Sequence, residues 1–172
     1  MCGRFAIFTK PEAYLAQIGL VGKVEPCAAV EYYNAYPTQH LPVVYRDPAE
    51  GLRCNMLHWG LIPTWAKDAS IGFKTSNARS ETAADKPSFR HAFFKQRAVI
   101  PIDGWFEWLR DGKHKRPYFH HRIDGRVIWI AGLWEHWINP ANQEPLKSFT
   151  LLTRNAEGKS SSIHDRMPVI LN

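Results

Sequence analysis

Cysteine is scarce in this sequence, which contains only Cys2, Cys27 and Cys54 among its 172 residues. The odd count and the lack of a CxxC pair argue against a scaffold held together by disulfides. The cysteines and histidines also do not cluster at the spacings that a tetrahedral zinc site requires. We therefore expect no disulfide framework, no metal site and no cofactor.

Long apolar runs are lacking as well. No stretch approaches the roughly 20 residues that a membrane-spanning helix needs. The N-terminus carries no basic segment followed by an apolar stretch, so a secretion signal is also missing. These features predict a cytoplasmic protein with no membrane partner.

Apolar and aromatic side chains are plentiful, at 45% and 13% of the residues. A chain of this length and composition is typical of one packed domain, and no repeat or linker divides residues 1–172. Lysine and arginine outnumber aspartate and glutamate by 22 to 16, which leaves a net charge of +6. This balance favours nucleic acid phosphates as partners, although charge alone does not decide the matter.

The first part of the chain predicts a strand and a short helix. Residues 1–8 alternate as a strand. Thr9 and Glu12 form a capping-box pattern at the start of a helix that ends near Gly19. The next predicted elements are strands over 41–45 and 52–62, joined as a hairpin by a turn at 47–51.

The second part begins with a helical segment over 80–97 that breaks at Pro87 and places Phe89 and Phe93 on one face. An antiparallel meander follows, and a last strand pair flanks a polar loop that holds His164. Strands without regular βαβ alternation indicate an α+β fold, in which antiparallel β-sheets form a barrel-like core with a few short flanking helices. The meander strands are 98–102, 105–109, 118–122 and 126–134, with turns at 111–112 and 124–125, and the last pair is 148–153 and 167–171.

Cys2 is the most informative residue, because removal of Met1 would leave a cysteine with its α-amine and thiol on adjacent carbons. An aldehyde condenses with such an amine to a Schiff base, and the thiolate then closes a five-membered thiazolidine. The α-amine has an unperturbed pKa of about 7.7 to 8.0, so much of it is nucleophilic at physiological pH. Taken alone, a second-position cysteine is more often a small packing residue.

Three further residues could join Cys2 in such chemistry. Asn77, Glu107 and His164 are residue types that suit an orienting group, a proton acceptor and a proton donor. Each also has an ordinary explanation, as a helix cap, an exposed strand position and a loop histidine respectively. Glu107 is the most telling of them, because the tryptophan and phenylalanine residues around it would desolvate a carboxylate.

Arginines and tryptophans form a third group, since cations and aromatic faces together suit phosphate contacts and base stacking on single strands. We expect the basic turn at 113–116 to be a solvated hairpin tip. Five tryptophans lie in apolar strand patterns and are predicted to be core: Trp59, Trp105, Trp129, Trp134 and Trp137. The residues predicted to contact nucleic acid are Arg4, Arg79, Arg166, Trp65 and Trp108.

Four motifs occur in order along the chain: MCGRF at 1–5, NARSET at 77–82, DGWFEW at 103–108 and HDRMP at 164–168. In this combination the sequence resembles the SOS response-associated peptidase family, also described as abasic site processing proteins. The intervening segments YPT at 36–38 and WGLIP at 59–63 are similar to that family too. The resemblance spans nearly the whole chain.

The resemblance implies that Met1 is removed and that Cys2 forms a stable thiazolidine with the ring-opened sugar of an abasic site in single-stranded DNA. Such a protein repairs DNA in a largely single-turnover reaction, with slow lyase-type reversal. Asn77 would hold the Cys2 end and the sugar, Glu107 would assist proton transfers at the amine, and His164 would protonate the sugar oxygen.

The resemblance also assigns the DNA contacts and the surroundings of the protein. The three arginines Arg4, Arg79 and Arg166 would hold phosphates, while Trp65 and Trp108 would stack or wedge beside bases. The expected partner is single-stranded DNA with abasic sites, bound by a monomer associated with the nucleoid. Family members usually continue past the HDRMP segment, so the sequence is expected to lack a C-terminal segment of this single domain.

Two other functions stay open at this point. A cysteine peptidase could use Cys2 with His164 and Asn77, and removal of Met1 by the protein itself would be its simplest activity. Against this, the sequence context of papain-like nucleophiles is missing. A passive single-strand binding module could use the arginines and tryptophans alone, but it would leave the terminal cysteine unexplained.

Overall fold

Five strands close into a barrel in the computed structural model, which describes residues 2–171. Around the ring the order is β10–β4–β3–β6–β9, and β9 pairs again with β10. Every pair is antiparallel except β10 with β4, which is parallel. The strands are β3 (His40–Asp47), β4 (Gly51–Trp59), β6 (Arg97–Ile102), β9 (Ile128–Ile138) and β10 (Pro145–Asn155).

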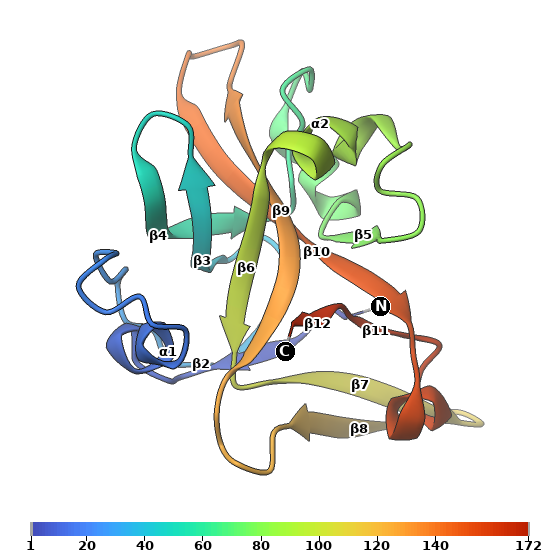
Figure 1. Cartoon of the computed structure of the whole chain (residues 1–172). Coiled ribbons are helices and arrows are strands. Elements are labelled where there is room, and N and C mark those ends of the chain that lie inside the picture. The colour runs from blue at the N-terminus through green and yellow to red at the C-terminus, as the bar shows by residue number, and fades with distance from the viewer. Residues whose placement is uncertain (1, 172) are drawn as a thin grey trace.

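Three short strands extend this barrel at one end. β5 (Asn77–Arg79) pairs parallel to β10, and β11 (Arg166–Pro168) pairs antiparallel to it. β12 (Ile170–Leu171) pairs with β9. The long strand β10 therefore holds two short strands that carry candidate residues (Figure 1).

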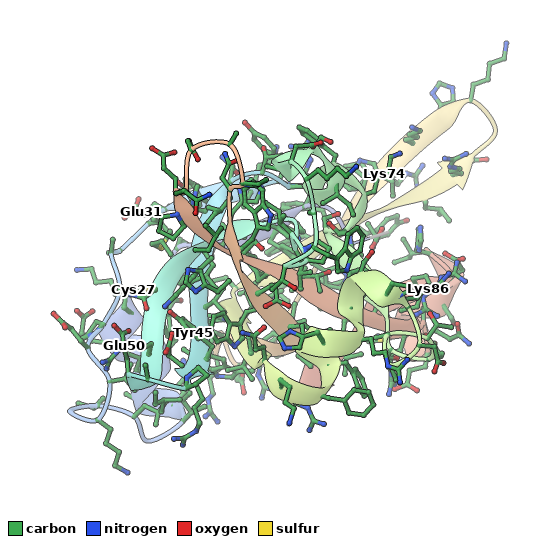
Figure 2. All side chains as sticks on the ribbon, turned by 90° about the horizontal axis from the view of Figure 1, so that it is seen from above. Cys27, Glu31, Tyr45, Glu50, Lys74 and Lys86 are labelled. Atoms are coloured by element: carbon green, nitrogen blue, oxygen red, sulfur yellow. The ribbon has the colours of Figure 1, made fainter. Side chains whose placement is uncertain are left out.

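A second sheet crosses one end of the barrel (Figure 1). Its strand order is β2–β1–β7–β8, so the first strand of the chain lies between an early and a late segment. β7 and β8 form a hairpin that projects from the body of the molecule (Figure 2). The bounds are β1 (Phe5–Ile7), β2 (Tyr32–Ala35), β7 (Gly104–Asp111) and β8 (His114–His121).

Helices are few and short. α1 (Pro11–Gln17) and α2 (Pro87–Lys95) each begin with a proline, whose fixed φ and missing N–H suit the first helical turn. Two 3-10 helices, Ala69–Lys74 and Gly158–Ser162, complete the set within residues 2–171. The mixed barrel, the additional sheet and the short helices confirm the predicted α+β class with a barrel-like core.

The core fills the barrel and the space under the second sheet. Its largest cluster contains Cys2 and Phe5 from the N-terminus together with Trp59 and Leu151 from barrel strands. The five tryptophans predicted to be core are all buried. Packing of the N-terminal residues against the barrel therefore fixes where Cys2 lies.

Three predictions of local structure were wrong. The first piece of the helical segment expected over 80–97 is absent, because residues 80–85 form turns and only Pro87–Lys95 is helical. Thr9 does not cap the first helix, because its hydroxyl donates to Asp103 instead and Lys10 takes the N-cap position without a side-chain bond. The strands β8 and β9 on either side of the turn at 124–125 belong to different sheets, so the meander is interrupted there. The hairpin turns at 47–51 and 111–112 are confirmed.

No helix in the part of the chain that the structure describes combines the length and apolar character needed to cross a membrane.

Candidate active site

A buried aspartate fixes the path of the N-terminal strand. Asp103, immediately before β7, accepts hydrogen bonds from the backbone N–H groups of Phe8 and Thr9, at 2.7 and 3.0 Å. The Thr9 hydroxyl donates to its other oxygen at 2.5 Å. Hydrogen bonds to an ionised carboxylate are stronger than neutral ones, so this clamp ties the end of β1 to the beginning of β7.

The antiparallel pairing of β1 with β7 brings the N-terminal residues, Cys2 among them, to the part of β7 that holds Glu107. Phe5 lies opposite Trp105, and the Phe106 N–H donates to the Arg4 carbonyl at 2.9 Å, so the pairing continues toward the N-terminus. Successive residues face opposite sides of a strand, and the alternation buries Trp105 and Glu107. Cys2 therefore meets a carboxylate that is more than 100 positions away along the chain.

The Cys2 thiol is fully buried and donates a hydrogen bond to the Glu107 carboxylate. Burial raises the pKa of this thiol far above its usual range, and the charge and hydrogen bond of Glu107 raise it further. The thiol is consequently protonated at neutral pH. A neighbouring base is needed to produce the thiolate, and Glu107 is in position to be that base.

Asn77 lies on β5 beside Leu151 of β10, in parallel register. Leu151 belongs to the same buried cluster as Cys2, which places the Asn77 side chain on the Cys2 side of the sheet. Its Nδ2 donates to the Ser76 hydroxyl at 3.4 Å. Its Oδ1 is shielded from solvent and accepts no hydrogen bond from the described residues, so it is available to a group that enters the site.

His164 and Glu107 both line a shallow pocket of about 300 Å³. The same pocket is bordered by Trp108, Arg110 and Lys115 of the projecting hairpin. Glu107 and His164, which can both exchange protons, thus line the same pocket as the positive side chains of Arg110 and Lys115. An anionic ligand with a reactive polar group fits this combination.

The imidazole of His164 has a neighbour suited to each of its protonation states. Its Nδ1 lies 3.0 Å from the backbone N–H of Arg166, which donates to it when the ring is neutral. The same nitrogen lies 2.8 Å from a carboxylate oxygen of Asp165, which accepts from it when the ring is protonated. These two contacts orient the imidazole ring where it lines the pocket.

Arg166 is held in a buried polar network. Its guanidinium donates to both carboxylate oxygens of Glu81, at 2.8 and 2.9 Å, and also to Asn155 and to the Thr153 carbonyl. The bidentate pair lowers the pKa of Glu81 to about 2. Its predicted contact with DNA phosphate stays a prediction, and this geometry means that such a contact would have to compete with Glu81.

We predict that Glu81→Gln makes stability less sensitive to acid. Because the folded-state pKa of Glu81 is lowered, its contribution is present above the unfolded value of about 4.3 and is lost as the pH falls toward 2. The Glu81 side chain is 45% exposed, so solvent screening limits the effect to about 1 kcal/mol. Urea unfolding, monitored by tryptophan fluorescence, should show that the variant is less stable than the parent at pH 7 and equally stable near pH 2. A difference in stability that stays the same from pH 7 to pH 2 would contradict the prediction.

The remaining predicted DNA contacts are spread more widely. Arg79 is exposed on β5 beside Thr153, next to the Arg166 network. The Arg4 guanidinium lies 5.1 Å from the centre of the Tyr36 ring and donates to Asn34 at 3.4 Å. Trp65 is 58% exposed and lies in a different pocket from His164 and Glu107. These assignments stay predictions.

Three residues near this site were not among the predicted ones. Arg110 and Lys115 lie opposite each other across the β7–β8 hairpin, and both border the pocket of His164. Lys115 belongs to the basic turn at 113–116 that was expected to be a solvated hairpin tip, whereas nothing in the sequence pattern singled out Arg110. Tyr36 holds Arg4 through its ring, and its place in the YPT segment was the signal that could have identified it.

Comparison with known proteins identifies the family. A model of the family "SOS response associated peptidase (SRAP)" matches residues 1–172. The chain belongs to the SOS response associated peptidase family. It is 38% identical over 172 residues to the abasic site processing protein YoqW of Bacillus subtilis strain 168, covering 99% of this chain and 76% of that relative.

Two further proteins are similar to this chain along nearly its whole length. The abasic site processing protein YedK of Escherichia coli strain K12 is 33% identical over 179 residues, covering 100% of this chain and 76% of YedK. A crystal structure of a protein from Bacteroides thetaiotaomicron superimposes with a TM-score of 0.85 at 26% identity. That alignment covers 99% of this chain and 77% of the other, so the fold is shared along the present sequence.

Proposed function

We propose that this protein processes abasic sites in single-stranded DNA by bonding covalently to them through Cys2. The observation that carries the proposal is the contact between the buried Cys2 thiol and the Glu107 carboxylate, beside the pocket that Glu107 shares with His164. The names of the relatives, which are abasic site processing proteins, support the same substrate. The proposal requires the removal of Met1, which lies outside the described residues.

The reaction follows from the paired amine and thiol. The free α-amine of Cys2 attacks the aldehyde carbon of the ring-opened sugar, and loss of one water gives a Schiff base. The Cys2 sulfur then bonds to the same carbon while the thiol proton passes to the nitrogen, which closes the thiazolidine. The aldehyde is consumed, so it can no longer lead to cleavage of the strand.

Each polar neighbour has a step to assist. Glu107 accepts the thiol proton, which is needed because burial keeps Cys2 protonated. His164 donates a proton to the sugar ring oxygen, so that the closed sugar opens to its aldehyde. Asn77 offers its free amide oxygen to the amine or to a sugar hydroxyl.

The DNA strand itself would follow the basic surface around the site. Arg4, Arg79 and Arg166 are proposed to contact phosphates, and Arg110 and Lys115 add charge along the hairpin. Trp65 and Trp108 offer aromatic surfaces on which bases can stack. A strong dependence of DNA affinity on salt follows from this arrangement.

The peptidase alternative is favoured by one observation, that His164 lines the same pocket as Glu107, which contacts Cys2. However, the group in direct contact with Cys2 is a carboxylate rather than an imidazole, and it raises the pKa of the thiol instead of lowering it. Cysteine peptidases depend on a thiolate with a lowered pKa. We therefore limit any peptidase activity to the removal of Met1.

The test is a denaturing gel of the purified protein, its N-terminus verified by mass spectrometry, after incubation with single-stranded DNA that carries one abasic site. We expect a heat-stable shifted band, with a mass equal to protein plus DNA minus about 18 Da, for the one water lost. Two controls isolate the chemistry. DNA whose abasic site is reduced to an alcohol, and protein with an N-terminal extension before Cys2, should give no band.

Failure of the correctly processed protein to form an adduct would reject the proposal. An adduct that forms equally with reduced abasic DNA would also reject it, because no aldehyde is then available. Binding that is seen only in native gels would favour the passive single-strand module.

A further inference from the structure

We propose that Cys27 and Cys54 form a second reactive site, a dithiol that hydrogen peroxide oxidises reversibly to an intramolecular disulfide. The two sulfurs lie 3.0 Å apart, although the cysteines are 27 positions apart in the sequence. Both thiols are free in the structure. The proposal does not rest on the function of Cys2.

The fold brings these cysteines together at a defined place. Cys54 points outward from barrel strand β4 into a small core. This core is covered by α1 and by the segment that connects α1 to β2. Cys27 lies on that segment, beside the β3–β4 hairpin, and is partly exposed (Figure 2). This end of the molecule is opposite the projecting β7–β8 hairpin, so the pair is separate from the candidate active site (Figures 1 and 2).

A third polar group completes the cluster. The Tyr14 hydroxyl from α1 lies 3.1 Å from the Cys27 sulfur and 3.7 Å from the Cys54 sulfur. Three groups that can share protons thus meet inside an otherwise apolar core, where an uncompensated polar group would be costly. Such a cluster can hold one negative charge by hydrogen bonding from the other two members.

The charge would reside on Cys54. A hydrogen bond shared with Cys27 lowers the pKa of Cys54 to about 7, and Tyr14 contributes in the same direction. The pKa of Cys27 is raised, first by the same hydrogen bond and then by burial. Near neutral pH about half of the molecules therefore contain a Cys54 thiolate beside a Cys27 thiol, which is the combination that disulfide formation uses.

The oxidation proceeds in two steps. The Cys54 thiolate attacks one oxygen of hydrogen peroxide, so an S–O bond forms, the O–O bond breaks and hydroxide leaves, giving a sulfenic acid. The Cys27 sulfur then attacks the Cys54 sulfur, so the S–S bond forms, the S–O bond breaks and the second hydroxide takes up the Cys27 proton. The hydroxide of the first step takes up the proton that Cys54 released on ionising, so two thiols and one peroxide become one disulfide and two waters.

Little movement is needed for the second step. A disulfide bond is about 2.0 Å long, so the sulfurs have to approach by only about 1 Å. The bond would tie the segment that leads into β2 to barrel strand β4. Because the crosslink restricts the unfolded chain, we expect the melting temperature to rise by about 5 to 10 °C.

Cys2 should be spared under the same conditions. Cys2 and Cys54 are both buried, but the pKa of Cys2 is raised by burial and by Glu107 whereas that of Cys54 is lowered, so Cys2 offers almost no thiolate at neutral pH. Peroxide reacts with thiolates rather than thiols. The structure therefore predicts that mild oxidation is selective for the Cys27–Cys54 pair.

The experiment is to treat the full chain with a low excess of hydrogen peroxide at pH 7.5 and measure intact mass and peptide maps without reduction. We expect a loss of about 2 Da, a crosslinked peptide that joins Cys27 to Cys54, and reversal of both by dithiothreitol. The raised melting temperature should disappear on reduction. Cys2→Ala should behave like the parent, whereas Cys27→Ser and Cys54→Ser should show neither the mass loss nor the thermal shift.

Three results would overturn the proposal. One is a mass gain of about 16 or 32 Da on these cysteines with no loss of 2 Da, since sulfenic and sulfinic acids would then form without closure. Another is oxidation of Cys2 before the pair. The third is a disulfide between two chains, detected as a dimer on a non-reducing gel.

Discussion

Cys2→Ala is expected to abolish the denaturant-resistant adduct with abasic-site DNA completely. Alanine keeps the free α-amine once Met1 is removed, so the Schiff base can still form, but no sulfur is present to close the thiazolidine. A Schiff base hydrolyses readily and does not survive a denaturing gel. Sodium borohydride, which reduces the Schiff base to a stable amine, should therefore restore a band with the variant.

The borohydride result separates chemistry from folding. Cys2 belongs to the largest buried cluster, and removing its sulfur leaves a small cavity that costs about 1 kcal/mol. A variant that had simply lost its structure would give no band with or without borohydride. Persistence of a heat-stable adduct without reductant in Cys2→Ala would show that another nucleophile makes the bond.

Local features of this fold could be predicted from the sequence. The β3–β4 hairpin follows from two apolar runs and a turn-forming segment, all within about 20 residues. The burial of Glu107 follows from the aromatic residues on either side of it in the DGWFEW motif. In both cases the deciding interactions lie close together along the chain.

Contacts between distant segments could not be predicted in this way. The meeting of Cys2 and Glu107 depends on the pairing of β1 with β7, which Asp103 fixes by binding Phe8 and Thr9. Nothing in the pattern of residues 1–8 specifies this partner. The same reasoning applies to Thr9. Its local pattern predicts a helix cap, but in the tertiary structure its hydroxyl donates to the Asp103 carboxylate instead.

Arg166 illustrates a different limit. Its position in the HDRMP motif predicts a functional role, but only the structure reveals that Glu81 and Asn155 already occupy its guanidinium. A side chain bound in this way positions the adjacent His164 through the backbone N–H that contacts the imidazole. The HDRMP motif therefore combines His164, the proposed proton donor, with a residue that holds it in place.

Glu107→Gln is expected to slow adduct formation by about 100-fold, the lower end of what general acid–base groups contribute. Glutamine is close in size and can still accept a hydrogen bond from the Cys2 thiol, but its amide cannot take up the proton. Loss of the negative charge also lowers the pKa of Cys2 part of the way toward its ordinary value. The lower pKa alone would favour the reaction. However, burial is the larger cause of the raised pKa, and the substitution leaves burial unaffected. The loss of the base therefore dominates.

Loss of the base and the lower pKa of Cys2 should change two measurable rates of Glu107→Gln in opposite directions, which makes the prediction specific. Single-turnover adduct formation should become slower, while alkylation of Cys2 by iodoacetamide at pH 8, measured by peptide mass, should become faster. Glu135→Gln is the matched control, because Glu135 is equally buried on β9 and bonds to His91 at 2.8 Å. It should lose comparable stability without changing either rate. If both variants slowed adduct formation alike, Glu107 would be a structural residue and the base would have to be sought elsewhere in the pocket, with His164 the next group to test.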